Sequence, residues 1–157
     1  TDHHPDQLRE SADERVLTRQ ALRAAVLRDL GWLFNCTRPQ PEPASGRIKE
    51  LELWARFDHA RNSVLNYGLP ALAGTTKSTL NRAAMERVIK EAISLFEPRI
   101  DAKTLAVEIK VGSKAQYNAL ALTIRGSMWS QPTPLELFVT ADVDLETGNT
   151  RMRDARK

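Results

Sequence analysis

The feature that most constrains the fold is a change in the spacing of apolar residues at Pro98. From Leu80 to Phe96, apolar residues recur every three or four positions, which is the period of a helix with one buried face. From Leu105 onward, apolar and polar residues alternate, which is the period of a strand with one buried face. Because Pro98 cannot continue a helix, we expect the helix to end at Phe96 or Glu97.

An earlier helical pattern predicts a second helix from about Glu14 to Asn35. Ser11 or Asp13 could supply its N-cap, because short side-chain oxygens accept hydrogen bonds from the first free amides. By the same argument, Ser78 or Thr79 could cap the later helix. The two helices therefore flank a central stretch whose structure the apolar pattern does not define.

That central stretch begins with a proline-rich link over residues 37–46, which interrupts helical structure. Residues 47–57 are compatible with either a helical turn or a brief strand. The run from Ser63 to Gly74 contains Asn-Tyr-Gly and Leu-Pro and reads as a loop.

The alternating part of the chain predicts a sheet. Its segments are Leu105–Val111, Leu120–Arg125 and Leu135–Asp144, and a turn at Glu146–Asn149 returns a short strand near Thr150–Arg153. Helices come first and strands second, which indicates an α+β fold. We expect both long helices to pack on one face of a mostly antiparallel sheet of about four strands.

Composition excludes several classes of protein. The chain has 157 residues, of which 41% are hydrophobic and 27% charged, as expected for one globular domain.

We place an extended segment at 1–13, the domain at 14–153 and a basic tail at 154–157. No apolar run reaches the ~20 residues of a membrane span, and no leader sequence is evident. The lone Cys36 cannot form an internal disulfide.

Motifs for cofactor or metal chemistry are missing: the sequence has no phosphate-binding glycine loop, no Cys-x-x-Cys and no His-Glu-x-x-His. We therefore expect no cofactor, no metal and no catalysis. Net charge is +3, and the C-terminal end is basic through Arg151, Arg153, Arg156 and Lys157. Without interleaved aromatic residues, this end favours a solvated tail or an acidic protein partner over nucleic acid.

Glu97 and Arg99 stand on either side of Pro98, where a carboxylate faces the negative end of the helix dipole. Arg99 can offset that charge by binding the carboxylate bidentately. The two residues could form a helix-exit ion pair, or they could point outward as a charged hook for a partner. Alternatively, Glu97 could be the general acid of a glycosidase, which requires a second carboxylate about 5–10 Å away. Candidates for that second carboxylate are Asp58, Asp101, Asp142 and Asp144.

Three segments, in this order and at this spacing, resemble the TssE family. They are Leu27–Asn35, Ser63–Pro70 and Glu97–Arg99. TssE proteins are baseplate wedge subunits of bacterial type VI secretion systems, related to phage wedge proteins sometimes labelled lysozyme-like. The motif positions of the resemblance are Asp29, Leu30, Leu33, Asn35, Ser63, Val64, Leu65, Asn66, Tyr67 and Gly68, followed by Glu97, Pro98 and Arg99.

The resemblance runs from about Thr1 to Arg153 and has three departures. Ala71 replaces the usual Asp after Leu-Pro, and Phe34 replaces a Leu at the end of the first motif. The chain opens at Thr1-Asp2, which in the family follows a Leu/Arg-rich segment, so we expect a few residues to precede it.

The resemblance implies a structural role on the cytoplasmic side of the bacterial membrane, with no membrane insertion. The protein would sit in a wedge with TssF and TssG, next to TssK. Glu97, Pro98 and Arg99 would dock on the TssF–TssG bundle. The hairpin of Leu135–Val143 and Thr150–Arg153 would offer a strand edge to the TssB/TssC sheath, with Arg151 and Arg153 facing an acidic segment.

Two alternatives remain at this point. A lysozyme-like glycoside hydrolase would place Glu97 and a second acid in a cleft. A small regulatory adaptor of the same fold would instead bind one partner in a one-to-one pair.

Overall fold

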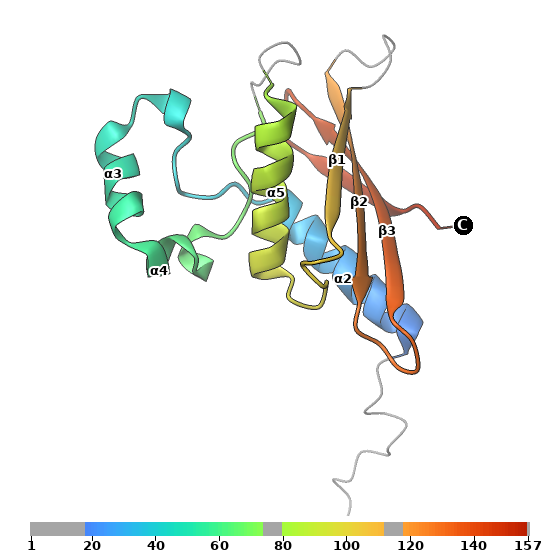
Figure 1. The fold of residues 1–157 in the computed structure, drawn as a ribbon. Coiled ribbons are helices and arrows are strands. Elements are labelled where there is room, and N and C mark those ends of the chain that lie inside the picture. The colour runs from blue at the N-terminus through green and yellow to red at the C-terminus, as the bar shows by residue number, and fades with distance from the viewer. Residues whose placement is uncertain (1–17, 74–79, 112–117, 157) are drawn as a thin grey trace, which may run out of the picture.

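Four strands form one antiparallel sheet in the part of the chain that the computed structural model describes, residues 18–73, 80–111 and 118–156 (Figure 1). In spatial order they are β1 (Ala106–Val111), β2 (Ala119–Met128), β3 (Leu135–Asp144) and β4 (Thr150–Asp154). Each strand pairs with its sequence neighbour, so the sheet is a simple meander. The hairpin return to β4 is confirmed.

Two long helices cover one face of this sheet, which confirms the predicted α+β class. The helices are α2 (Arg19–Phe34) and α5 (Arg82–Phe96); α5 lies over β1 and α2 lies over β3 and β4. Between them the chain forms a curved arm to one side of the body (Figure 1). The arm contains η2 (Pro43–Ser45), α3 (Ile48–Arg56), α4 (Asp58–Arg61) and η3 (Val64–Asn66), so the stretch 47–57 forms a helix rather than a strand.

The first helix begins later than its apolar pattern predicted. Thr18 is not helical, and its hydroxyl oxygen accepts a hydrogen bond from the Ala21 amide at 3.1 Å. The prediction of a continuous helix through this position was therefore wrong, because an N-cap side chain satisfies an amide that the preceding turn would otherwise bond. The predicted caps Ser11 and Asp13 lie outside the described residues.

The second long helix also has a different cap from the predicted ones. Asn81 accepts a hydrogen bond from the Ala84 amide at 3.1 Å and precedes the first helical residue. Ser78 and Thr79 lie outside the described residues. The predicted end is confirmed, since Phe96 is the last helical residue.

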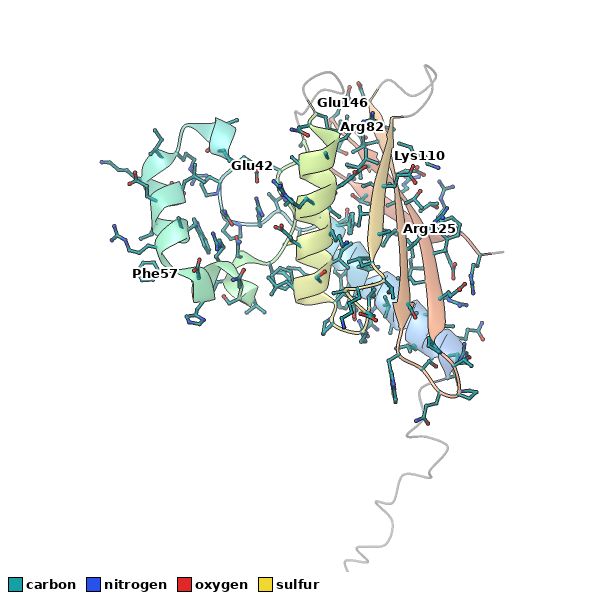
Figure 2. The ribbon with its side chains drawn as sticks, viewed as in Figure 1. Glu42, Phe57, Arg82, Lys110, Arg125 and Glu146 are labelled. Atoms are coloured by element: carbon teal, nitrogen blue, oxygen red, sulfur yellow. The ribbon has the colours of Figure 1, made fainter. Side chains whose placement is uncertain are left out.

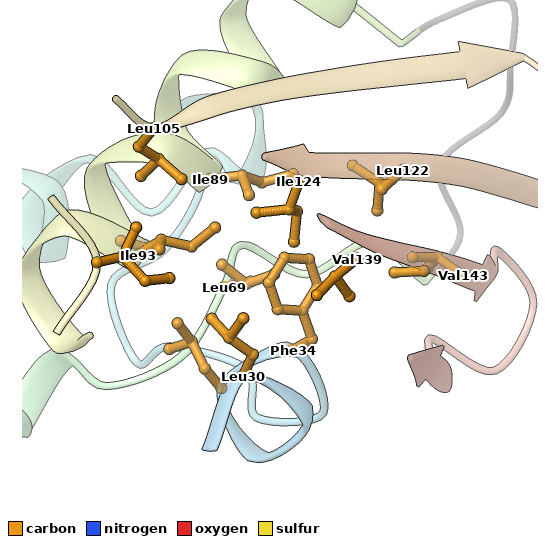
Figure 3. Packing of buried hydrophobic residues seen from close by; sticks show 14 of the residues in the cluster. Leu30, Phe34, Leu69, Ile89, Ile93, Leu105, Leu122, Ile124, Val139 and Val143 are labelled. Atoms are coloured by element: carbon orange, nitrogen blue, oxygen red, sulfur yellow. The ribbon is translucent and has the colours of Figure 1, made fainter. Parts of the chain in front are cut away.

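The hydrophobic core lies between the two helices and the sheet (Figure 3). Register places Leu122 opposite Ala141 and Ile124 opposite Val139, so the alternating apolar residues of β2 and β3 share one face. Fully buried side chains of α2 and α5 pack on that face, among them Leu30, Leu33, Ile89 and Ile93. The core therefore fixes how each helix lies on the sheet.

No helix in the described ranges combines the length and the apolar composition that crossing a bilayer requires.

Candidate functional site

The three segments that carry the sequence resemblance meet in space. Asp29 comes from α2, Tyr67 follows η3, and Glu97 and Arg99 follow α5. The Tyr67 ring stands edge-on against Phe96, with ring centroids 5.0 Å apart. Residues separated by up to seventy positions thus converge where the exit of α5 crosses α2.

Arg99 is the centre of this convergence. Its Nε and Nη2 donate to the two carboxylate oxygens of Glu97 at 2.6 and 2.5 Å, and Nη2 also donates to Asp29 at 2.5 Å. This is the bidentate geometry that a planar guanidinium forms with a carboxylate, extended to a second acid. We refer to Asp29, Glu97 and Arg99 as the Arg99 cluster.

Glu97 is buried in this cluster, with only 2% of its surface exposed. The interpretation of Glu97 as an outward hook was wrong, whereas the helix-exit ion pair is confirmed and includes Asp29 as a further partner. The cause is local: the Glu97 amide closes the last turn on Ile93, which holds the side chain beside the body. Arg99 supplies the positive charge that a buried carboxylate at a helix C-terminus needs.

The charges of the cluster shift the pKa values of its members. Hydrogen bonds from Arg28 and Arg99 lower the pKa of Asp29 against the opposing effect of burial. The hydrogen bond to Glu97, reinforced by Asp29, raises the pKa of Arg99. Burial raises the pKa of Tyr67, and the charges of Cys36, Asp29 and Glu97 add to that increase. Asp29 and Arg99 are therefore held in their charged forms.

This geometry does not resemble a pair of glycosidase carboxylates. Arg99 donates to both Glu97 and Asp29, so a guanidinium joins the two carboxylates. A retaining or inverting glycosidase needs the sugar between them instead. Glu97 also lines neither the hollow beside α5 nor the one beside β2 and β3.

The second motif segment fastens the base of the arm. Asn66 is buried; its side chain accepts from the Gln40 amide at 3.1 Å and donates to the Gln40 side chain at 2.9 Å and to the Arg61 carbonyl at 3.1 Å. Leu69 exchanges main-chain hydrogen bonds with Cys36 and Arg38. The two ends of the arm are thereby tied together.

Gly68 allows this close approach of two chain segments. Its φ is +125°, and a Cβ there would lie 2.5 Å from the Cys36 carbonyl oxygen. Two of the remaining motif residues, Val64 and Leu65, are exposed. The Ser63 hydroxyl caps η3, because it accepts a hydrogen bond from the Leu65 amide. The family-like run therefore includes structural positions beside exposed ones.

Asn35, the last residue of the first motif segment, contacts the edge of the sheet. Its side chain accepts from the Thr150 amide at 2.9 Å and donates to the Thr150 carbonyl at 3.0 Å. In the β3–β4 ladder, Asp144 bonds Asn149 and Ala155 bonds Phe138. Antiparallel pairing then directs the main-chain groups of residues 150, 152 and 154 outward.

The outward edge of β4 is therefore only partly occupied by the chain itself. Asn35 bonds both main-chain groups of Thr150. Within the described residues, the main-chain amides and carbonyls of Met152 and Asp154 have no hydrogen-bond partner. Unpaired groups of this kind are what a further strand can bond.

Of the basic residues predicted at this end, Lys157 lies outside the described residues, and two of the other three pair with acids. Arg153 forms an ion pair with Asp142, and Arg156 with Glu136. Arg151 is exposed and forms no ion pair within the described part of the chain. The end is thus a mixed surface rather than the one-signed patch that the sequence predicted.

Sequence reasoning missed two of these links. Asp29 was identified as a motif position, but nothing in the sequence paired it with Arg99 seventy residues later. The bonds from Asn35 to Thr150 were likewise missed, although an amide side chain directly after a helix was a signal for a capping role.

The fold and the site together describe a small α+β protein with two notable polar features. One is the Arg99 ion-pair cluster, and the other is a sheet edge whose main-chain groups are only partly bonded. The sequence matches the family described as Baseplate wedge protein gp25 over residues 20–133. The chain therefore belongs to this family, which supplies structural, non-catalytic baseplate proteins of contractile injection systems. Searches of curated proteins and of solved structures gave no match.

We expect Arg99→Met to lower the free energy of unfolding by about 2 kcal/mol, because it leaves the buried Glu97 carboxylate without its partner. Arg28→Met is the matched control, since Arg28 also bonds Asp29 but its side chain is 57% exposed. That control should cost less than about 1 kcal/mol. Urea unfolding of the two variants measures the difference, and equal losses would contradict the central role of Arg99.

We expect Gly68→Ala to destabilise the protein more than Gly46→Ala. Both glycines have positive φ, so both substitutions carry a conformational cost of about 1 kcal/mol. At Gly46 a Cβ would meet nothing within 4 Å, whereas at Gly68 it would overlap the main chain of residues 36–38. Thermal melts compare the two variants. Indistinguishable melting temperatures would show that the main chain at the base of the arm can shift to accommodate the added Cβ.

Proposed function

We propose that the protein is a TssE-type wedge subunit of a type VI secretion baseplate, acting on the cytoplasmic side of the membrane. The family match supports a baseplate wedge protein. The finer assignment is supported by the three TssE-like segments and by the meeting of all three around one cluster. In this proposal one domain over residues 14–153 binds partners and performs no chemistry.

The proposed docking surface for TssF and TssG is the turn Glu97–Pro98–Arg99, in which Pro98 and Arg99 reach the surface and the buried Glu97 holds Arg99 in place. Pro98 is exposed, and the Arg99 side chain is 37% exposed. Within the described residues, Nη1 of Arg99 forms no hydrogen bond, while Nε and Nη2 are committed to the two acids. A guanidinium fixed on one side presents its remaining donors in a set direction, which lowers the entropy lost on binding.

Pro98→Glu tests this surface without removing an ion pair. We expect the variant to keep the melting temperature and to weaken co-purification with TssF and TssG at least tenfold, because it adds a carboxylate beside an acidic pair. Ala102→Glu is the control, since it adds the same charge at another exposed position of the same loop. Equal retention of TssF and TssG by both variants would contradict docking at this turn.

The proposed contact with the TssB/TssC sheath is the outward edge of β4. The observation that supports it is the set of main-chain groups at Met152 and Asp154 that the described residues leave unbonded. A strand from a neighbouring chain can continue the sheet there by β-augmentation. Exposed Arg151, which forms no ion pair within the described residues, could face an acidic segment of that strand. TssK is proposed to lie in the same baseplate.

Met152→Pro tests the edge selectively. The Met152 amide points away from β3, so proline removes a donor from the outer edge while the ladder to β3 keeps its hydrogen bonds. We expect TssF and TssG binding to survive and sheath elongation to fall to background in fluorescence microscopy of labelled TssB. Normal sheath growth with a folded variant would exclude β4 as the starting edge.

A further inference from the structure

The outer edge of β1 carries a hydrogen bond from a helix. The Ile109 amide donates to the Glu86 carboxylate of α5 at 2.8 Å, so the main-chain groups of Ile109 point away from β2. Because these groups alternate in direction along a strand, positions 107, 109 and 111 form the outward edge of β1. Ile109 is the middle one of the three.

Glu86 reaches this edge from the helix that covers β1. The strand and α5 are in contact, and Figure 2 shows Arg82, at the start of α5, at the same end of the body as Lys110 of β1. Glu86 is half-buried. Arg82 and Lys90 lie one helical turn before and after it, yet within the described residues Glu86 forms no ion pair with either. Its carboxylate is therefore committed to the Ile109 amide.

This hydrogen bond interrupts the edge of β1 at its centre. A strand that joins a sheet exchanges hydrogen bonds with successive outward residues. At Ile109 the donor is already used, and a carbonyl oxygen of the added strand would meet a negative carboxylate. On β4, by contrast, Met152 and Asp154 are successive outward positions whose main-chain groups the described residues leave unbonded. The two edges of the sheet therefore differ in what they offer an added strand.

The order of the strands makes this difference important. All three pairings of the sheet are antiparallel, so β1 and β4 run in opposite directions. A second copy in the same orientation would therefore place its β1 antiparallel to β4 of the first. Repetition of that contact gives an open chain of copies that never closes. Edge-to-edge pairing of this kind is the hazard that exposed strands carry.

We propose that Glu86 closes the β1 edge to strand addition, so that the sheet accepts a strand only at β4 and copies of this chain do not join β1 to β4. The inference rests on the proposed role of β4 as the strand-accepting edge. It adds the device that keeps this edge available to a partner, because a second copy of the chain has no free β1 to offer. Growth of the sheet then has one direction.

Glu86→Ala in the full chain tests this device. We expect hydrogen exchange of the Ile109 amide, followed by NMR, to accelerate at least tenfold. We also expect the variant to self-associate in sedimentation equilibrium at concentrations where the wild type is monomeric. Glu86→Gln is the matched control, since its side-chain oxygen can still accept from Ile109 and should keep the chain monomeric. Glu91→Ala changes an exposed carboxylate of the same helix and should alter neither measurement.

A second substitution identifies the surface through which the copies associate. Adding Met152→Pro to Glu86→Ala should restore the monomer, because the proline removes a donor from the outward edge of β4. Circular dichroism melts establish that each variant folds. If Glu86→Ala does not fold, Glu86→Asp replaces it, since the shorter side chain keeps its charge but withdraws from Ile109 and should give the same exchange and association.

Four results would overturn the proposal. They are unchanged exchange of the Ile109 amide in the folded variant, a monomeric variant despite an exposed Ile109 amide, association that persists with Met152→Pro, and association of the wild type or Glu86→Gln as strong as that of Glu86→Ala. Sheath growth is measured with Glu86 in place. Failure of this inference and failure of the contact between β4 and the sheath are therefore separate results.

Discussion

The guanidinium of Arg99 is the interaction on which the arrangement of the polar residues depends. It neutralises a carboxylate that the end of α5 buries, and it ties that carboxylate to α2 through Asp29. A buried acid at the negative end of a helix would otherwise oppose folding. With Arg99 in place, the exit of α5, the side of α2 and the Tyr67 segment occupy fixed positions relative to one another, and Pro98 is held at the surface between them.

Rigid attachment is also what the arm and the sheet edge have in common. Asn66 and Gly68 fasten the arm at its base, and Asn35 fastens the end of α2 to the start of β4. On the opposite edge, Glu86 of α5 accepts a hydrogen bond from the Ile109 amide of β1 at 2.8 Å. The arm, the β4 edge and the β1 edge are thus each held by a polar side chain, which is the preorganisation that an assembly subunit benefits from.

Local patterns predicted the elements well and their contacts poorly. The change of period at Pro98 gave the end of α5, the four strands and the class of fold, because burial on one face imposes a period of 3.6 or 2 directly on the sequence. Helix starts were misplaced, since Thr18 and Asn81 cap through single hydrogen bonds that several nearby residues could have made. The burial of Glu97 and its link to Asp29 depend on how α5 crosses α2, which no local pattern encodes. For several of the positions that the resemblance singled out, the structure shows a structural role, as in the contacts of Asp29, Asn35 and Asn66.

The carboxamide of Asn35 has a consequence for any strand that joins β4. It bonds both outward main-chain groups of Thr150, as the backbone of an added strand would. A strand added at the edge of β4 can bond the main chain of Met152 and Asp154, but at Thr150 the main-chain groups are already bonded by Asn35. Asn35 therefore restricts the register of the added strand. Because a shift of one residue would turn every side chain of that strand to the opposite face, this restriction also selects the face that it turns toward the core.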